Sequence, residues 1–136
     1  MRNVISKTTC WLLLAVGLLS GCEGREYYNV CVLNRTDRDI DEVLVTGPDG
    51  PIDMGVLVKG GADTHSSFFG PVPRTLTVSW RDRARNSHRV QVNLDGLTPR
   101  HFRGTIYLKI RPNEQVHAAA FAEDQIAEAA KYDASP

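Results

Sequence analysis

Between Arg74 and Arg81, apolar and polar side chains alternate at successive positions. A repeat of two among β-branched and aromatic residues indicates a strand that buries one face and exposes the other. The alternation resumes after the polar stretch at residues 82–87, so the two runs together predict an antiparallel hairpin. The apolar positions are Leu76, Val78 and Trp80 in the first strand and Val90, Val92 and Leu94 in the second.

Short runs of a similar kind fill much of the remaining chain and predict further strands. A nearly continuous apolar run suggests that the first of them is covered on both faces. In the proline-containing stretch 62–73, we expect Phe68 and Phe69 to lie in a loop or on a sheet edge. The expected strands cover residues 27–33, 42–46, 54–58, 106–111 and 115–121.

About six to eight short strands with Gly, Pro, Asn and Asp turns predict an all-β fold. We expect a small antiparallel β-sandwich, with a small barrel as the alternative, because no rhythm of alternating strands and helices supports a parallel sheet. A signal helix is expected at the N-terminus. Residues 122–132 are rich in Ala and Glu and predict either a short C-terminal helix or a frayed tail.

The first 22 residues combine a basic start, an apolar core and a small-residue box before a cysteine. Arg2 and Lys7 precede the apolar run Trp11–Leu19, which is too short for a helix crossing a bilayer of about 30 Å. The box Leu19-Ser20-Gly21-Cys22 resembles a bacterial lipoprotein signal. The resemblance implies cleavage before Cys22 and acylation of this residue. The alternatives are an ordinary secretory signal or an apolar helix of a cytosolic protein.

Glu23 follows the box where an inner-membrane lipoprotein carries Asp, so the resemblance implies the periplasmic face of the bacterial outer membrane. We expect a signal peptide at residues 1–21, a lipidated tether at 22–26, a β-sandwich domain at 27–121 and a helical or disordered tail at 122–136. The tether reaches at most about 18 Å when extended. The domain is therefore expected to lie close to the membrane.

Three cysteines are present, and only one of them is expected to stay in the domain as a free side chain. Cys10 leaves with the signal and Cys22 carries the lipid, so Cys31 has no internal partner for a disulfide. Cys31 belongs to an apolar run and is expected to be a small buried hydrophobe rather than a nucleophile or an intermolecular bridge.

The net charge of zero conceals a segregation along the chain. Residues 22–73 carry four basic and nine acidic side chains, residues 74–112 carry nine basic and two acidic, and residues 113–136 carry one basic and five acidic. Two interpretations remain open. Either the basic segment is an interaction surface, or basic strands lie beside acidic ones and neutralise them.

Four arginines of the predicted hairpin are the candidate partner-binding residues: Arg81, Arg83, Arg85 and Arg89. The first three are spaced by two and project to the same side of an extended chain. Guanidinium groups suit carboxylates and phosphates, which an acidic protein, a lipid headgroup or an anionic glycan supplies. The expected compartment argues against nucleic acid. A hairpin tip charged only for solubility is the alternative.

The chain is expected not to be an enzyme and to need no metal or cofactor. His65, His88, His101 and His117 follow no metal-ligand spacing and are interpreted as surface or turn histidines. No serine lies in a Gly-x-Ser-x-Gly elbow. Residues 64–67 place a histidine beside hydroxyls, but sequence adjacency does not supply the geometry of a triad.

The stretch Gly70–Arg81, in which a proline-containing segment leads into a strand of the form x-Val-x-Trp, resembles small periplasmic lipoproteins found beside type VI secretion effectors. Those proteins carry paired cysteines where this chain has Ser66-Ser67-Phe68-Phe69. The resemblance implies an immunity protein that neutralises a secreted effector. We therefore predict a lipid-anchored, non-catalytic protein-binding module. The alternative is a structural envelope lipoprotein that binds anionic lipid or a cell-wall polymer through the basic hairpin.

Overall fold

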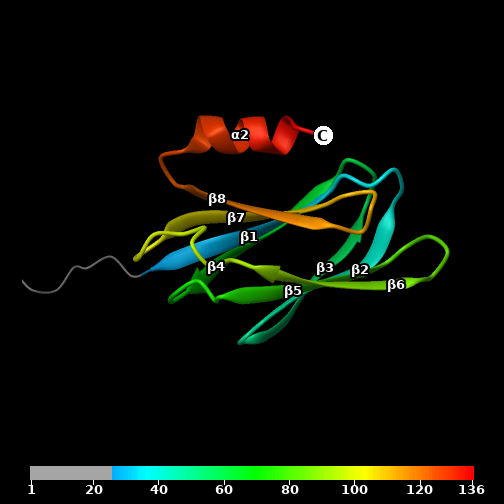
Figure 1. The fold of residues 1–136 in the computed structure, drawn as a ribbon, viewed down its shortest axis with the longest axis horizontal. Coiled ribbons are helices and arrows are strands. Elements are labelled where there is room, and N and C mark those ends of the chain that lie inside the picture. The colour runs from blue at the N-terminus through cyan, green and yellow to red at the C-terminus, as the bar shows by residue number, and fades with distance from the viewer. Residues whose placement is uncertain (1–25) are drawn as a thin grey trace, which may run out of the picture.

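The computed structural model describes residues 26–136, apart from the side chains of Ser66 and Ser67, and shows a two-layer β-sandwich with one helix on its outside (Figure 1). The expected signal helix and Cys22 lie outside the described residues. The elements are β1 (Tyr27–Asn34), β2 (Ile40–Gly47), β3 (Gly50–Leu57), β4 (Ala62–Phe69), β5 (Thr75–Arg81), β6 (Ser87–Asn93), β7 (Arg103–Ile110), β8 (Val116–Ala122) and α2 (Ile126–Ala134). The all-β sandwich prediction is confirmed.

One sheet has the order β3-β2-β5-β6 and is antiparallel throughout. The predicted hairpin forms its β5–β6 half, with Val78 opposite Val90 and Trp80 opposite His88. Trp80 and Val78 are buried because every second residue of β5 points toward the other sheet. The period of two seen in the sequence is therefore the inner face of this sheet.

The second sheet has the order β4-β1-β7-β8 and differs from the expectation in one respect. β1 pairs in parallel with β7, from Tyr27 opposite Arg103 to Asn34 opposite Ile110. The expectation of a purely antiparallel sandwich is therefore wrong at this pair. A parallel pair needs a long crossover, and here the chain supplies it through the other sheet instead of through a helix.

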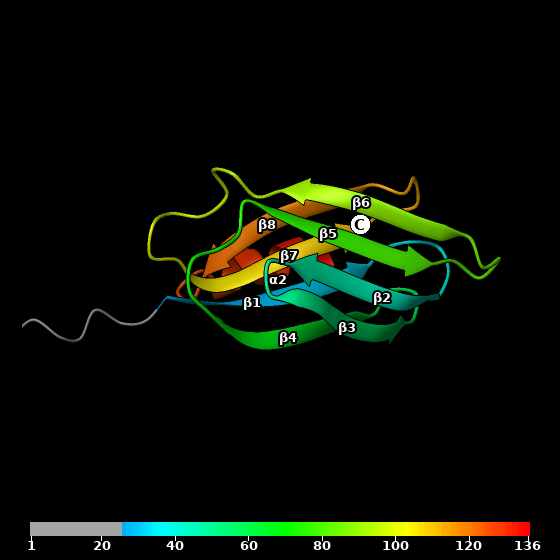
Figure 2. The ribbon, with the colours of Figure 1, turned by 90° about the horizontal axis from the view of Figure 1, so that it is seen from below.

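Residues 62–69 form β4, the edge strand of the second sheet, so the edge alternative for Phe68 and Phe69 is confirmed and the loop alternative is wrong. This strand shows little alternation in its sequence because it pairs on one side only, with β1. Figure 2 shows β4 beneath β3, at one side of the sandwich.

The C-terminal segment is helical from Ile126 to Ala134, a few residues later than the expected start at 122, because Ala122 ends β8. Helix α2 lies over the outer face of the second sheet (Figure 1). Tyr132 packs there against Tyr107 and Phe121, with ring centroids 6.0 Å and 5.6 Å away. The helix explains why β1 is buried on both of its faces, as its apolar sequence predicted.

Cys31 and Leu33 point from β1 into this outer layer and are 5% and 0% exposed. Cys31 is a free, buried cysteine, as expected, and burial raises the pKa of its thiol. A thiol held in this state is a poor nucleophile. Among residues 26–136, the sandwich is therefore held by packing and hydrogen bonds without a disulfide.

Lys109 is buried as deeply as the apolar core, at 1% exposure, on the outer face of β7. Its Nζ donates to the Tyr132 carbonyl oxygen at 2.7 Å and to the carbonyl oxygen and hydroxyl of Ser135 at 2.8 Å and 2.7 Å. Burial lowers the pKa of Lys109, with Arg35 and Arg111 adding to the effect. The lysine thus fixes the last carbonyls of α2, where a helix carries partial negative charge.

Candidate functional site

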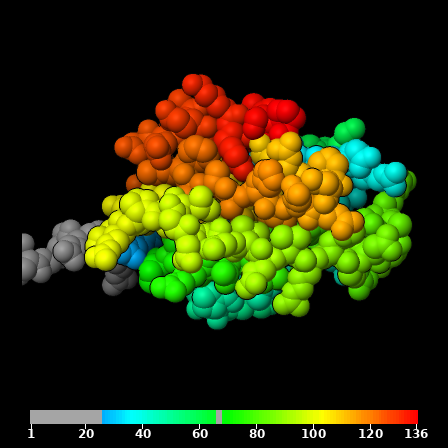
Figure 3. All heavy atoms as spheres, in the orientation of Figure 1, coloured from blue at the N-terminus to red at the C-terminus, as the bar shows by residue number. Residues whose placement is uncertain are grey.

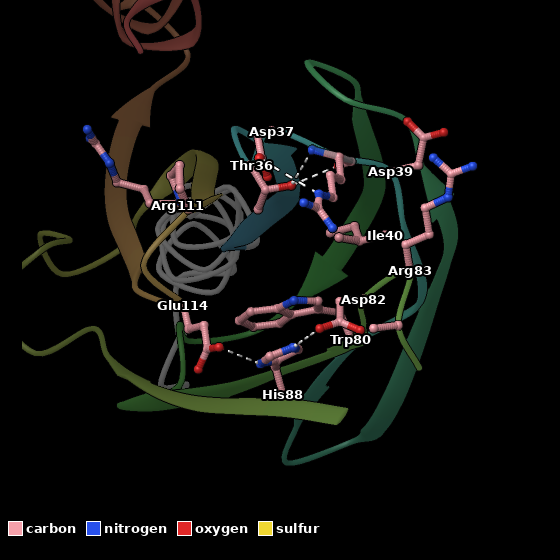
Figure 4. Close-up of a pocket in the computed structure, with 13 residues that line it drawn as sticks. Thr36, Asp37, Asp39, Ile40, Trp80, Asp82, Arg83, His88, Arg111 and Glu114 are labelled. Carbon is pink, nitrogen blue, oxygen red and sulfur yellow. Dashed lines mark hydrogen bonds and ion pairs between the residues drawn. The ribbon is translucent and has the colours of Figure 1, made fainter. Parts of the chain in front are cut away.

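Three connections meet at one end of the sandwich: residues 35–39 after β1, 82–86 after β5 and 111–115 after β7. They enclose a pocket of about 180 Å³, shown in Figure 4. The connection at residues 35–39 joins β1 of the second sheet to β2 of the first. The connection at 82–86 closes the β5–β6 hairpin of the first sheet, and the one at 111–115 closes the β7–β8 hairpin of the second. We call this surface the loop end.

The loop end lies opposite the start of β1. Tyr27 pairs with Arg103 at one end of the sandwich, whereas Asn34, immediately before the first connection, pairs with Ile110 at the other. The eight residues of β1 span about 25 Å between them. Figure 2 shows the β5–β6 connection projecting from the end that is farthest from the beginning of β1.

His88 is the most constrained side chain of the loop end. Its ring stacks on Trp80, with centroids 5.2 Å apart and an interplanar angle of 18°. Its Nε2 lies 3.0 Å from Asp82 Oδ2 and its Nδ1 lies 3.4 Å from Glu114 Oε1 (Figure 4). Carboxylates only accept hydrogen bonds, so both contacts are hydrogen bonds only when both ring nitrogens carry a proton. The interpretation of His88 as a surface histidine is wrong, since its side chain is 12% exposed.

Asp82 stabilises the β5–β6 turn through hydrogen bonds that its carboxylate accepts within the turn. Asn86 donates to it twice, from its backbone N–H to Oδ1 and from its side-chain amide to Oδ2, each at 2.9 Å. The hydrogen bond from the Asn86 side chain, followed by those from His88 and from the Asn86 backbone N–H, lowers the pKa of Asp82 to about 2. The carboxylate therefore stays ionised over the physiological range and holds the turn and the imidazole together.

Asn34 shapes the neighbouring connection and is 0% exposed. Its amide nitrogen donates to the carbonyl oxygens of Arg38 at 2.8 Å and Leu57 at 2.9 Å. Its amide oxygen accepts from the hydroxyl of Thr36 at 2.6 Å and from the Thr36 backbone N–H at 3.0 Å. A buried side-chain amide with these partners replaces missing backbone hydrogen bonds and fixes the loop conformation.

The structure divides the four candidate arginines into two pairs. Arg81 and Arg85 form ion pairs with acidic residues of β2: Arg81 Nε lies 3.1 Å from Glu42 Oε2, and Arg85 Nη1 lies 3.0 Å from Asp41 Oδ2. Arg83 and Arg89 are exposed and form no ion pair with any residue of the described segment. Arg83 lies beside Asp39 at the rim of the pocket (Figure 4).

The extended geometry expected for Arg81, Arg83 and Arg85 is wrong, because β5 ends at Arg81 and Arg85 adopts a left-handed φ of 68° in the turn. Arg81 and Arg85 nevertheless reach the same carboxylate, Glu42. For these two arginines, the structure favours the interpretation in which basic and acidic strands neutralise each other. Sequence analysis did not single out Asn34, Glu114 or the contact of Trp80 with His88, which depends on the β5–β6 register.

The polar side chains that line the pocket mostly contact one another. Both imidazole nitrogens of His88 are engaged by carboxylates, and Thr36, a hydroxyl residue of the lining, donates within its own loop. Among residues 26–136, no group of three His, Cys, Asp or Glu side chains is placed to hold a metal ion. Within that same range, no helix has the length and apolar character required to cross a membrane.

The chain is thus a two-sheet β-sandwich with a charged surface built by three loops. No family model matches the chain, and no curated protein matches it. Among solved structures, it is similar to the NMR structure of a protein from Eubacterium rectale, with a TM-score of 0.48 and 18% sequence identity. That similarity covers 74% of this chain and 92% of the other.

Proposed function

We propose that this protein is a lipid-anchored periplasmic lipoprotein that acts as a non-catalytic protein-binding module, with the loop end as its binding surface. The single observation that carries the proposal is the convergence of three internally braced loops at the end opposite the tether. Bracing of this kind lowers the ordering cost of association, because the loops are held in position before a partner arrives.

The size of the pocket supports a protein partner over a small ligand. At about 180 Å³ it is smaller than the roughly 300–1,000 Å³ typical of small-molecule sites, and an adjoining hollow beside Asp41 and Arg83, at about 320 Å³, lies at the lower limit of that range. Its rim presents exposed charges of both signs, among them Arg38, Arg83, Asp37 and Glu114. Charges at the rim of an interface steer association and select the partner. A secreted effector that the protein neutralises is the partner class implied by the resemblance of residues 70–81.

The test places a photo-crosslinking residue at Arg83 of the full chain in its native membrane. Arg100 is the matched control, because it is also an exposed arginine but lies in the β6–β7 connection at the other end. We expect an adduct with one periplasmic protein from position 83 and none from position 100. We also expect a deletion strain to become sensitive to that protein. Equal labelling from both positions contradicts the proposal.

The second candidate is a structural envelope lipoprotein whose basic hairpin binds an anionic polymer. It is favoured by the exposure of Arg83 and Arg89 and by their lack of an ion-pair partner in the described segment. The hairpin points away from the tether, so the polymer in question is one that lies beyond the anchoring membrane, such as the cell wall. Binding to isolated peptidoglycan that falls with salt and is lost in Arg83→Gln/Arg89→Gln supports this function over the first.

A further inference from the structure

Exposed apolar side chains gather at the end of the sandwich where β1 begins. Among the described residues, five large apolar side chains are exposed, and three of them lie at this end: Phe69 at 71%, Leu97 at 37% and Ile126 at 75%. They come from the end of β4, the β6–β7 connection and the start of α2. Strand register brings these segments together, since Tyr27 pairs with both Phe69 and Arg103, and Gly104 pairs with Ala122. We call this surface the tether end.

The charges of the tether end are mostly paired with one another. His101 Nδ1 lies 2.7 Å from Glu26 Oε1, Arg74 Nε lies 3.9 Å from Asp95 Oδ1 and Arg103 Nε lies 3.8 Å from Glu123 Oε2. Other exposed charges at this end, Arg100, Asp49 and Asp124, have both signs. The surface therefore has no dominant sign of charge, and its distinguishing feature is apolar.

The tether determines what this surface meets. Cys22 precedes Tyr27 by five residues, a distance of at most about 18 Å when extended. With acyl chains on Cys22, the start of β1 is held at the lipid headgroups. Figure 3 shows the β6–β7 connection (yellow) gathered beside the first residues of β1 (blue), so the same end carries the loop with Leu97.

We infer that the tether end, through Phe69, Leu97 and Ile126, rests on the membrane interface and orients the loop end away from the bilayer. The inference rests on the lipid anchor of the proposed function and adds an orientation to it. Isolated apolar side chains contribute little to membrane affinity on their own, but a tether removes most of the entropic cost of bringing them to the surface. Because the contact is apolar, it does not depend on anionic lipid.

The test uses the full lipidated chain in phosphatidylethanolamine vesicles that contain a lipid-borne fluorescence quencher. An environment-sensitive dye is attached through Leu97→Cys, or through Val58→Cys as the control. Val58 is 58% exposed and apolar but follows β3 at the opposite end, and Cys31 is buried and therefore not expected to label. We expect the dye at position 97 to lose most of its fluorescence and the dye at position 58 to lose none. Added salt or phosphatidylglycerol is expected to leave this difference unchanged.

A matched pair of variants tests the three side chains. With the dye on Thr98→Cys, we expect Phe69→Ser/Leu97→Ser/Ile126→Ser to abolish most of the quenching. Val56→Ser/Val58→Ser changes two exposed apolar residues at the loop end and is expected to leave it intact. All five side chains are exposed, so both variants are expected to fold, which circular dichroism verifies.

The mass of the mature N-terminus separates the two proposals. A chain without acyl groups on Cys22 overturns both the anchored function and the membrane orientation. If the chain is lipidated but the dyes at positions 97 and 58 are quenched equally, or if neither dye is quenched, the membrane orientation is wrong. The proposal of an anchored binding module is not affected by that result. Quenching that disappears in high salt replaces the apolar contact with an electrostatic one and also overturns the inference.

Discussion

At the scale of single residues, the conformation of the loop end is maintained by hydrogen bonds and ion pairs between side chains of its own connections. Asp82 is the clearest case, because it accepts hydrogen bonds from Asn86 and contacts His88 while remaining on the surface of the molecule. The imidazole in turn joins the β5–β6 turn of one sheet to Glu114 in the β7–β8 turn of the other. A substitution at Asp82 is therefore expected to disturb both turns.

Acid is expected to remove the contribution of Asp82 to stability. Its pKa in the folded protein, about 2, is below the ordinary value of 3.8, so the contribution is complete above about pH 4 and disappears as the pH falls toward 2. Urea unfolding between pH 2 and 7 measures it. We expect Asp82→Asn to lower the free energy of unfolding at pH 7 and to lose less stability than the natural chain between pH 4 and 2. The control Asp37→Asn changes a carboxylate that is 72% exposed and is expected to retain the natural pH dependence.

Gly104 is expected to tolerate no side chain. A Cβ at this position meets the carbonyl oxygen of Phe121 and comes within 2.8 Å of the Ala122 Cα and 2.9 Å of the Phe102 ring. Two of these neighbours are backbone atoms of β8 and cannot move without breaking the β7–β8 ladder. We expect Gly104→Ala to lower the free energy of unfolding by about 1–3 kcal/mol or more in denaturant titrations. Thr105→Ala, one position along β7, is the control, and an equal loss in both variants contradicts the packing argument.

At the scale of elements, α2 is attached to the second sheet by its C-terminal turn. Lys109 supplies three hydrogen bonds to this turn, and Arg35 Nη2 donates to the carbonyl oxygen and carboxylate of Asp133, both at 2.7 Å. The helix itself has no side-chain N-cap and spans nine residues, so it depends on these contacts for its helical conformation.

Replacing Lys109 by methionine is expected to release α2 locally. The substitution keeps the aliphatic stem but removes the Lys109 donor from the Ser135 carbonyl oxygen and from the Tyr132 carbonyl oxygen, which retains the Ser135 hydroxyl and N–H, at a cost of about 1–3 kcal/mol. Hydrogen exchange of residues 126–134 measures the effect and is expected to accelerate, together with thiol labelling of Cys31 beneath the helix. Lys131→Met changes an exposed lysine of the same helix and serves as the control. Unchanged exchange in Lys109→Met is the result that contradicts the attachment.

At the scale of the whole molecule, the two sheets share one apolar core. Ile106 of the second sheet and Val45 of the first are 0% exposed and belong to the same cluster. The second sheet also packs its outer face against α2, but each sheet buries its inner face only against the other, and the described segment contains no disulfide to hold one sheet when the other opens. The domain is therefore expected to unfold as a unit.

Ile106→Ala is expected to lower the free energy of unfolding by about 2–5 kcal/mol, because the shared core cannot close the resulting cavity completely. Val56→Ala, at a position 66% exposed, is expected to change it by less than about 0.5 kcal/mol. Urea titrations followed by Trp80 fluorescence and by far-UV circular dichroism measure both. Coincident transitions are expected, and separate transitions for the two probes contradict the shared core.

The sequence predicted those parts of the fold in which local pattern and burial agree. The alternation through Leu76, Val78 and Trp80 located β5 because its inner face is buried and its outer face polar. The pairing of β1 with β7 was not predictable in this way, because strand pattern shows which face is buried but not which neighbour lies alongside. The strand β4 was uncertain for a different reason: an exposed edge strand requires little alternation.

At the site, sequence reasoning identified the arginines but not their partners. The acidic residues that pair with Arg81 and Arg85 lie on β2, about 40 residues away, and only the β2–β5 register brings them together. His88 was misassigned because a histidine at the start of a polar strand carries no local sign of burial. The β5–β6 register, which the sequence alone did not define, places His88 opposite Trp80, on which its ring stacks.

The parallel pairing of β1 with β7 also affects when the protein is able to fold during its synthesis. Residues paired in this ladder are 76 positions apart, an interval that takes about 4–15 s to translate. Until the chain has grown past Ile110, β1 lacks one of its two neighbours, so the centre of the second sheet is incomplete. The nascent chain therefore cannot complete its second sheet until β7 has been synthesised, although every strand of the first sheet precedes β7 in the sequence.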